Sequence, residues 1–169
     1  MHYNYCPICG TKLKDKKAGD DGNVPYCYTC SKYWFDGFSS AAIVLVANEY
    51  GEMAMLRQGY LSHDYWTYVA GYMKPGESAE ETAVREVYEE LGLKIERLEY
   101  GGTHWFPMGD QLMHGFIGFV KKKDFTLSSE VDEAVWINAA DAPTRMFPEV
   151  PGNTQYPLYR QYLKMTGNK

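Results

Sequence analysis

Apolar and polar positions along the chain predict strands interrupted by two helices. Residues 41–47 are an unbroken apolar run, which is typical of one buried strand. Residues 42–48 and 53–57 flank the sequence Glu-Tyr-Gly-Glu, a hairpin signal. The remaining apolar segments predict further strands and a closing helix, at residues 66–72, 93–105, 112–120, 134–137 and, for the helix, 155–165.

The first helix has clear start and stop signals. It follows the break Lys74-Pro75-Gly76, and Ser78 is placed to act as N-cap with Glu81 completing a capping box. Gly92 stands where a left-handed residue would end the helix. The resulting order of strands, helix, strands and helix indicates an α/β fold in which helices cover a mixed sheet.

One face of this helix carries three carboxylates. At about 100° per residue, Glu86, Glu89 and Glu90 fall within an arc of about 100°. Crowded acids repel one another unless cations hold them, and carboxylate oxygens are ligands that Mg²⁺ and Mn²⁺ prefer. The alternative, a solvated acidic face, would place Lys or Arg four residues after each acid. Only Glu90 has such a partner, Lys94, so the spacing favours a metal site.

All four cysteines lie near the N-terminus, where Cys6 and Cys9 form one C-x-x-C pair and Cys27 and Cys30 form another. This spacing is typical of a four-thiolate zinc ribbon. Two disulfides or a redox dithiol are the alternatives, and disulfides are disfavoured without secretion. The zinc would be structural, because so short a segment cannot bury enough apolar surface to fold alone. We expect a ribbon at residues 1–36, with residues 12–26 as a loop between two short hairpins, and a second domain at residues 37–169.

Net charge and hydropathy limit the classes of binding partner that we expect for this chain. The chain has 17 basic and 22 acidic residues, a net charge of −5, which argues against a broad nucleic-acid surface. A phosphorylated substrate is still compatible, because bound metal ions supply positive charge. No apolar run reaches the length of a signal peptide or a membrane span, so we expect a cytoplasmic protein without a membrane partner.

Residues 71–93 match the Nudix box, G-x5-E-x7-REV-x-EE-x-GL, at every defined position. The chain therefore resembles the Nudix hydrolase family. The resemblance implies an α/β/α sandwich on a mixed sheet, and metal-dependent hydrolysis of a nucleoside diphosphate linked to another group. Divalent ions would neutralise the pyrophosphate and lower the pKa of the attacking water. The general base stays open between a box glutamate and an acid from a later loop.

The same resemblance assigns roles to single residues. It implies that the three helix glutamates bind Mg²⁺ or Mn²⁺. It also implies that Arg85 orients them through an ion pair and that Glu77 supports the cluster near the helix start. Gly71 and Gly92 would be the backbone residues that permit the loop–helix–loop shape.

A four-cysteine ribbon directly before a Nudix domain resembles the NADH pyrophosphatase subfamily. Trp105-Phe106-Pro107 echoes part of that subfamily's SQPWPFPxS signature, whereas the flanking residues have diverged. Residues 130–136 resemble its E-x-x-E-A-x-W stretch, in which the first acid reaches the metals. Glu130 is therefore the candidate fourth carboxylate, with Glu133 as second choice.

Candidate substrate contacts are weaker. Trp105 and Phe106 are candidates to stack on a base, an interaction of about 1–3 kcal/mol, or to form the core end of a strand. Arg57, with Gln58 after it, could reach a phosphate or form a surface pair.

Three functions are consistent with these residues. The first is hydrolysis of an NADH- or NAD-like dinucleotide to two mononucleotides. The second is hydrolysis of ADP-ribose or another nucleotide sugar, and the third is non-catalytic nucleotide sensing. The complete set of box acids argues against the sensor. A homodimer built on the aromatic segment around Trp34 is an open alternative.

Overall fold

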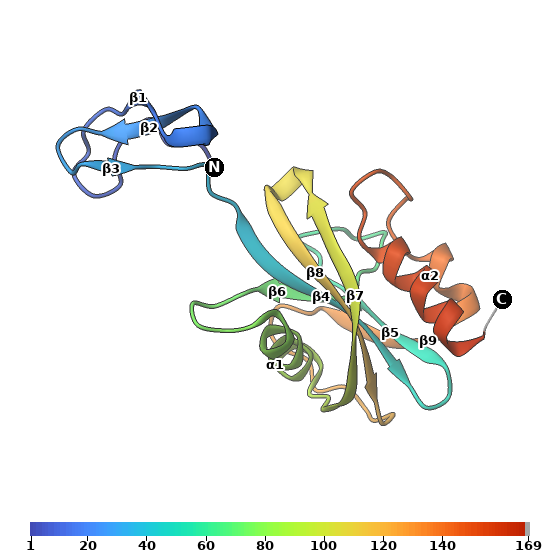
Figure 1. The fold of residues 1–169 in the computed structure, drawn as a ribbon. Coiled ribbons are helices and arrows are strands. Elements are labelled where there is room, and N and C mark those ends of the chain that lie inside the picture. Colours follow the sequence, from blue (N-terminus) through green and yellow to red (C-terminus); the bar gives the residue numbers. More distant parts are fainter. Residues whose placement is uncertain (168–169) are drawn as a thin grey trace. The chain divides into compact units, whose positions relative to one another are not determined.

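The strand β4 (Ser39–Asn48) lies at the centre of a six-stranded mixed sheet in the computed structural model, which describes residues 1–167 (Figure 1). Its side chains alternate between two buried clusters. Ile43 and Leu45 belong to one cluster, and Ala42 and Val44 belong to the other. Because both faces of β4 are covered, its sequence is a continuous apolar run rather than an alternation of apolar and polar residues.

The other strands are arranged on both sides of β4. On one side β8 (Gln111–Val120) runs parallel to β4, and β7 (Ile95–Phe106) pairs antiparallel with β8. On the other side β6 (Val69–Tyr72) pairs with the first half of β4, and β5 (Glu52–Arg57) joins at Ala47. The edge strand β9 (Glu133–Asn138) pairs with β5. Two short 3-10 helices, Pro107–Gly109 and Ala139–Thr144, lie in the connections.

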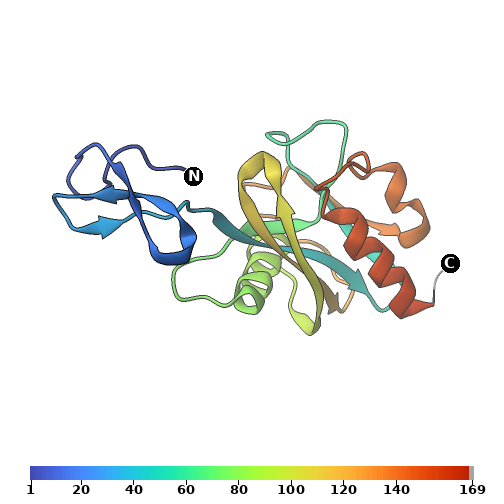
Figure 2. The ribbon, with the colours of Figure 1, turned by 45° about the horizontal axis from the view of Figure 1, so that its top comes forward.

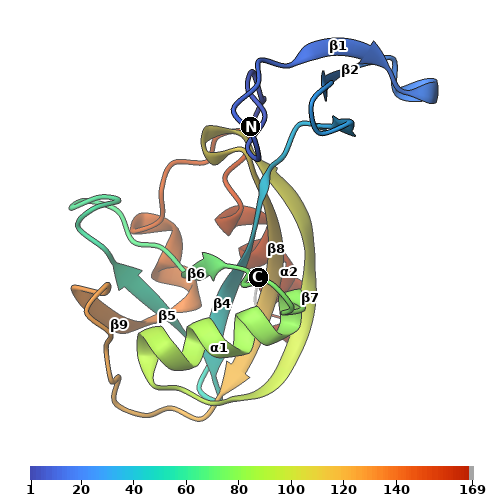
Figure 3. The same ribbon diagram turned by 90° about the vertical axis from the view of Figure 1, so that its left-hand side faces the viewer.

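The two α-helices cover opposite faces of this sheet (Figures 1, 2 and 3). The helix α1 (Ala79–Leu91) buries Val87 and Leu91 in the cluster that contains Val44. The helix α2 (Gln155–Thr166) buries Leu158 and Tyr162 in the cluster that contains Leu45. The predicted α/β/α sandwich is therefore confirmed. No helix in the described part of the chain has the length and apolar character to cross a bilayer.

The predicted limits of α1 are confirmed in atomic detail. The Ser78 hydroxyl accepts a hydrogen bond from the Glu81 amide, 3.2 Å, and the Glu81 carboxylate accepts one from the Ser78 amide, 2.8 Å. Gly92 has a φ of 69° and donates to the Tyr88 carbonyl. The strand predicted at residues 66–72 is shorter, because β5 takes over the same edge of β4. Trp66 and Thr67 form only isolated bridges.

Residues 1–38 form a separate compact unit with its own three-stranded sheet. The prediction of a loop at residues 12–26 is wrong. Most of this segment is a hairpin of β1 (Lys14–Lys17) and β2 (Asn23–Cys27), joined by a 3-10 turn at Gly19–Asp21 and followed by β3 (Lys32–Tyr33). The Lys16 ammonium lies 3.8 Å from the centroid of the Tyr26 ring. The Lys16 side chain, which also lies over the rings of Tyr28 and Tyr33, gives this sheet a packed aromatic face that its charged sequence conceals.

Gly101 on β7 provides a test of the packing between α2 and the sheet. A Cβ at this position would lie 2.1 Å from the Leu158 Cδ2 atom. We expect Gly101→Ala to lower the free energy of unfolding by about 1–3 kcal/mol through overpacking, measured by urea denaturation.

Leu158→Ala alone should cost about 2–5 kcal/mol, because it leaves a cavity. In the double variant the total loss of stability should be smaller than the sum of the two single losses, because the smaller side chain at residue 158 makes room for the new methyl group. Full additivity would contradict the predicted clash.

Candidate active site and metal centre

Gly71 and Glu86 show why the strand β6 carries a glycine next to its last residue. A Cβ on Gly71 would lie 2.0 Å from the Glu86 Cδ atom. Any side chain at residue 71 would therefore displace this carboxylate from the edge of the sheet. Gly71 is not in the left-handed region, unlike Gly92. The first glycine of the box is thus required for space, whereas Gly92 is required for its backbone conformation.

Arg85 holds three carboxylates with one guanidinium. Its Nε and Nη2 atoms donate to the two oxygens of Glu77 at 2.7 and 2.8 Å. Its Nη1 atom donates to Glu86 at 2.5 Å and to Glu89 at 2.9 Å. The side chain of Arg85 is only 17% exposed, and such partly desolvated, charge-assisted bonds are stronger than surface ion pairs. The structure thus brings together Arg85, Glu77, Glu86 and Glu89, as the sequence predicts.

Glu77 is the most fully bonded of these acids. Besides Arg85, it accepts hydrogen bonds from the Lys74 amide, 3.0 Å, and from the Thr82 hydroxyl, 2.9 Å. The Arg85 guanidinium, together with the Lys74 amide, lowers the pKa of Glu77 to about 2. This carboxylate is therefore ionised at all physiological pH values, and its oxygens are directed at Arg85 and the start of the helix. That geometry suits a positioning role.

Glu90 differs from the other acids because it is buried without a compensating charge. It is 3% exposed, and its Oε2 atom is buried without a hydrogen-bond partner. Its Oε1 atom lies 3.4 Å from the Gln58 Nε2 atom. Burial, followed by the negative charges of Glu86 and Glu130, raises the pKa of Glu90 to about 8. Burial of an unpaired carboxylate is costly, so this unpartnered oxygen is a candidate ligand for a cation.

The two acids considered for the later segment lie in different surroundings. Glu130 belongs to the connection between β8 and β9, and its charge contributes to the raised pKa of Glu90. Glu133 instead pairs across the sheet with Arg57, whose Nη2 atom lies 2.6 Å from the Glu133 Oε2 atom. Arg57 is thus engaged in a cross-strand ion pair, while Gln58 after it is buried beside Glu90.

The donor set on α1 fits a hard divalent cation. It consists of carboxylate oxygens on one helix face, one of them buried and without a hydrogen-bond partner. These oxygens are not drawn into one tight group. Among the described residues, the cysteine cluster alone gathers three or more ligand atoms that all lie within 4.8 Å of one another. Magnesium tolerates this arrangement, because it keeps several waters and binds through few carboxylates.

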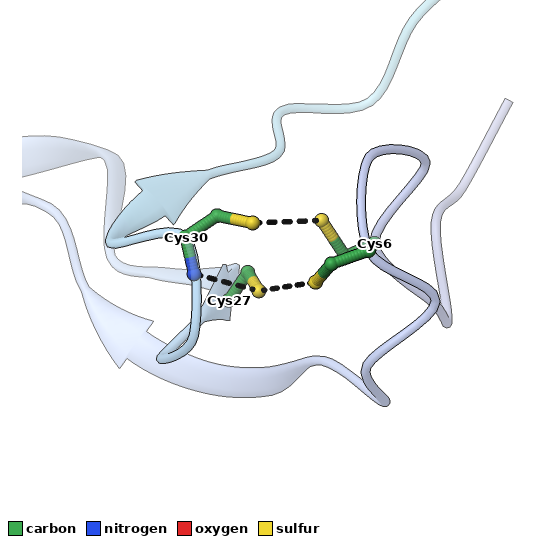
Figure 4. A group of neighbouring side chains, drawn as sticks. Cys6, Cys27 and Cys30 are labelled. Carbon is green, nitrogen blue, oxygen red and sulfur yellow. Dashed lines mark hydrogen bonds between the residues drawn. The ribbon is translucent and has the colours of Figure 1, made fainter.

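The four cysteines form that tight group. The Cys6 and Cys30 sulfurs lie 3.9 Å apart, and the Cys9 and Cys27 sulfurs 3.5 Å apart. Figure 4 shows the sulfurs of Cys6, Cys27 and Cys30 directed at a common centre. A tetrahedral zinc with bonds of about 2.3 Å requires sulfurs about 3.8 Å apart, whereas a disulfide requires about 2.0 Å. All four cysteines are free, so the arrangement fits zinc and not a disulfide.

Trp105 and Phe106 do not share one surface. They are consecutive in β7, opposite Leu112 and Gln111 of β8, so their side chains project from opposite faces of the sheet. Phe106 packs against the α2-side cluster, whereas Trp105 is 46% exposed. A single base on one face of the sheet would therefore contact only one of the two rings.

Three residues of the site are not singled out by any motif. Gln58 lies beside Glu90, and Asp132 accepts a hydrogen bond from the Gly59 amide at 2.5 Å. Tyr60 is 72% exposed but lies near the acids, since desolvation and then the charges of Glu90 and Glu130 raise its pKa. In the sequence, only the turn after β5 marks this region. The contacts themselves join segments that are distant in the chain, so no local pattern predicts them.

The comparison that decides the family concerns the second unit. The NUDIX domain model matches residues 37–158. The chain belongs to the Nudix family. It is 31% identical over 143 residues to the NAD-capped RNA hydrolase NudC of Pseudomonas aeruginosa, covering 84% of this chain and 50% of that protein. It is 33% identical over 141 residues to Nudix hydrolase 19, chloroplastic, of Arabidopsis thaliana, covering 78% and 32%.

This Nudix chain thus spans about half the length of the NudC relative, or less in the case of the Arabidopsis protein. The crystal structure of a NUDIX hydrolase from Nitrosomonas europaea has a TM-score of 0.74 to this chain, with 18% identity. The matched region covers 99% of this chain and 94% of the chain from Nitrosomonas europaea. At this identity the likeness shows a common fold.

The cysteine geometry predicts about one zinc per chain, measured by elemental analysis of protein purified without chelator. Cys27→Ser should reduce the zinc to near zero and lose the structure of residues 1–38, because metal binding and folding are coupled in such modules. Tyr28→Phe in the same turn should retain the metal. Zinc well below one per chain in the wild type would exclude the ribbon site.

The raised pKa of Glu90 predicts a pH-dependent stability in buffer without Mg²⁺ or Mn²⁺. The folded state binds a proton that the unfolded state releases between pH about 4.5 and about 8, so stability should fall as the pH rises through this window. Glu90→Gln should remove this component, so the stability of the variant relative to the wild type should increase from pH 5 to pH 8. A constant difference between the two proteins would show that Glu90 titrates normally.

Proposed function

We propose that this chain is a divalent-metal-dependent hydrolase that cleaves the pyrophosphate bond of an NADH- or NAD-like dinucleotide to give two mononucleotides. The observation that carries the proposal is the carboxylate face of α1. Three acids are braced by Arg85, and a fourth, Glu90, is buried with an unpartnered oxygen. A purely structural helix would not require this concentration of negative charge.

Each residue of the site has a role in this proposal. Glu86, Glu89 and Glu90 are the metal ligands on α1, and Glu130 is the fourth carboxylate from the connection before β9. Arg85 and Glu77 are positioning residues, because their bonds fix the rotamers of the ligands. The bound Mg²⁺ or Mn²⁺ supplies charge neutralisation and an acidified water. The four cysteines hold a structural zinc.

The charges of the protein's own side chains explain why hydrolysis would need a bound metal ion. The chain carries a net charge of −5, and its one central cation, Arg85, is already bonded to three acids. Among the described residues, the only other ion pair to these acids comes from the Lys74 ammonium, which lies 3.6 Å from Glu89. A pyrophosphate would therefore be repelled from this face without divalent ions. The proton acceptor for the attacking water is one of the clustered carboxylates, either a box glutamate or Glu130.

The dinucleotide assignment is supported by the ribbon, by Trp105-Phe106-Pro107 and by the similarity to a relative named as an NAD-capped RNA hydrolase. ADP-ribose or a nucleotide sugar is the second candidate, favoured by the divergence of the residues that flank Trp105. Both substrates share a nucleoside diphosphate, so the metal site would act on either in the same way.

Hydrolysis of a substrate panel tests the proposal. With Mg²⁺, we expect release of mononucleotides from NADH and NAD at a higher kcat/KM than from ADP-ribose, measured by chromatography. A capped RNA oligonucleotide belongs in the same panel. Higher activity on ADP-ribose would select the second candidate. Glu89→Gln should lower kcat by about 100-fold or more, because losing even an outer-shell partner costs about 10–100-fold.

Glu80→Gln is the matched control, since Glu80 is an exposed acid in the first turn of the same helix. It should retain full activity. If the wild type turns over no substrate with metal, or if Glu89→Gln leaves the rate unchanged, the metal-hydrolase assignment is wrong.

A further inference from the structure

Gln58 is a buried polar residue whose side chain belongs to no structural motif. It follows β5 and is 5% exposed. Its backbone carbonyl starts the next turn, since it accepts hydrogen bonds from the Leu61 and Ser62 amides at 2.8 and 3.1 Å. The turn makes no use of the side chain. Instead, the Gln58 Nε2 atom lies 3.4 Å from the Glu90 Oε1 atom.

Backbone contacts on both sides fix the place of Gln58. The carbonyl of Arg57 accepts a hydrogen bond from the Asp132 amide at 3.0 Å. The amide of Gly59 donates to the Asp132 carboxylate at 2.5 Å. Asp132 therefore bonds to the residues immediately before and after Gln58. The backbone that carries the Gln58 side chain is thus held in place before any ligand binds.

The same segment also reaches Glu90 itself. The Ser128 amide donates to the Glu90 carbonyl at 3.3 Å, and the Val131 amide donates to the Ser128 carbonyl. Three segments distant in sequence thus meet at Glu90, through its backbone or its side chain: the turn after β5, the last part of α1, and residues 128–132. In this junction the Glu90 carboxylate accepts a hydrogen bond from the side-chain amide of Gln58.

We propose that Gln58 is a positioning residue for Glu90, and this inference rests on the proposed function, in which Glu90 is a metal ligand. The Gln58 amide holds the Oε1 atom and leaves the Oε2 atom, which has no hydrogen-bond partner, to face the cation. An amide is suited to this task because it is a neutral donor. A Lys or Arg here would cancel the negative charge that attracts the cation, and an acid would add repulsion.

Mn²⁺ affinity of the zinc-loaded protein, measured by electron paramagnetic resonance, tests this role separately from turnover. Gln58→Met keeps the length and volume of the side chain but removes the donor. We expect Mn²⁺ binding to weaken about tenfold, within the range typical of outer-shell partners. At saturating Mg²⁺, kcat should fall while KM for the nucleotide changes little. Gln58→Asn, which withdraws the amide by one methylene, should weaken Mn²⁺ binding in the same direction and serves if the Met variant does not fold.

Gln155→Met is the matched control. Gln155 is also buried, and its side chain bonds the Trp66 carbonyl at 3.0 Å and the Phe147 amide at 3.3 Å. Loss of these contacts should lower the thermal stability but leave Mn²⁺ affinity within twofold of the wild type. If Gln155→Met weakens Mn²⁺ binding as much as Gln58→Met, the effect is general destabilisation and the inference is overturned.

The remaining outcomes separate the inference from the proposed function. Mn²⁺ affinity of Gln58→Met within twofold of the wild type overturns the positioning role alone. Unchanged Mn²⁺ affinity in Glu90→Gln overturns both, because Glu90 is then not a ligand. If Gln58 acts through Glu90, adding Gln58→Met to Glu90→Gln should cause little further loss, whereas an independent tenfold loss would contradict the coupling.

Discussion

The contact between the Arg85 guanidinium and three carboxylates is the interaction on which the site depends. Glu86 and Glu89 on the helix and Glu77 just before it repel one another, and in the folded protein this repulsion must be offset continuously. Arg85 does so from a position that is mostly shielded from water, with Nε and Nη2 bonded to Glu77 and Nη1 shared between Glu86 and Glu89. The planar guanidinium suits this role better than an ammonium would, because it donates in several fixed directions.

The division of charge around this hub has a chemical purpose. Glu77, Glu86 and Glu89 share the guanidinium, whereas Glu90 receives only a neutral amide. Negative charge is therefore compensated at one end of the face and left uncompensated at the other. The uncompensated end is also the buried end, where the dielectric constant is low and the attraction for a divalent ion is strong.

Much of this arrangement follows from local sequence, and the rest does not. The limits of α1 could be predicted because the capping box and Gly92 act over three or four residues. The buried strand β4 follows from its unbroken apolar run, and the carboxylate face follows from helical periodicity. The hairpin within residues 12–26 does not follow from the sequence pattern, because Lys16, rather than an aliphatic residue, lies over its aromatic rings. For Gln58 the sequence suggests only a phosphate contact, and for Asp132 it suggests no role, since their contacts are made with residues 32 and 73 positions away.

The helix α1 contributes to the hydrophobic core and to the ligand set at the same time. Val87 and Leu91 are fully buried against the sheet, while Glu86, Glu89 and Glu90 project from the neighbouring face. Inserting or deleting one residue within this helix would rotate everything after it by about 100°. Apolar side chains would then take the places of the acids, and acids would face the core. The helix therefore tolerates substitution better than a change of length.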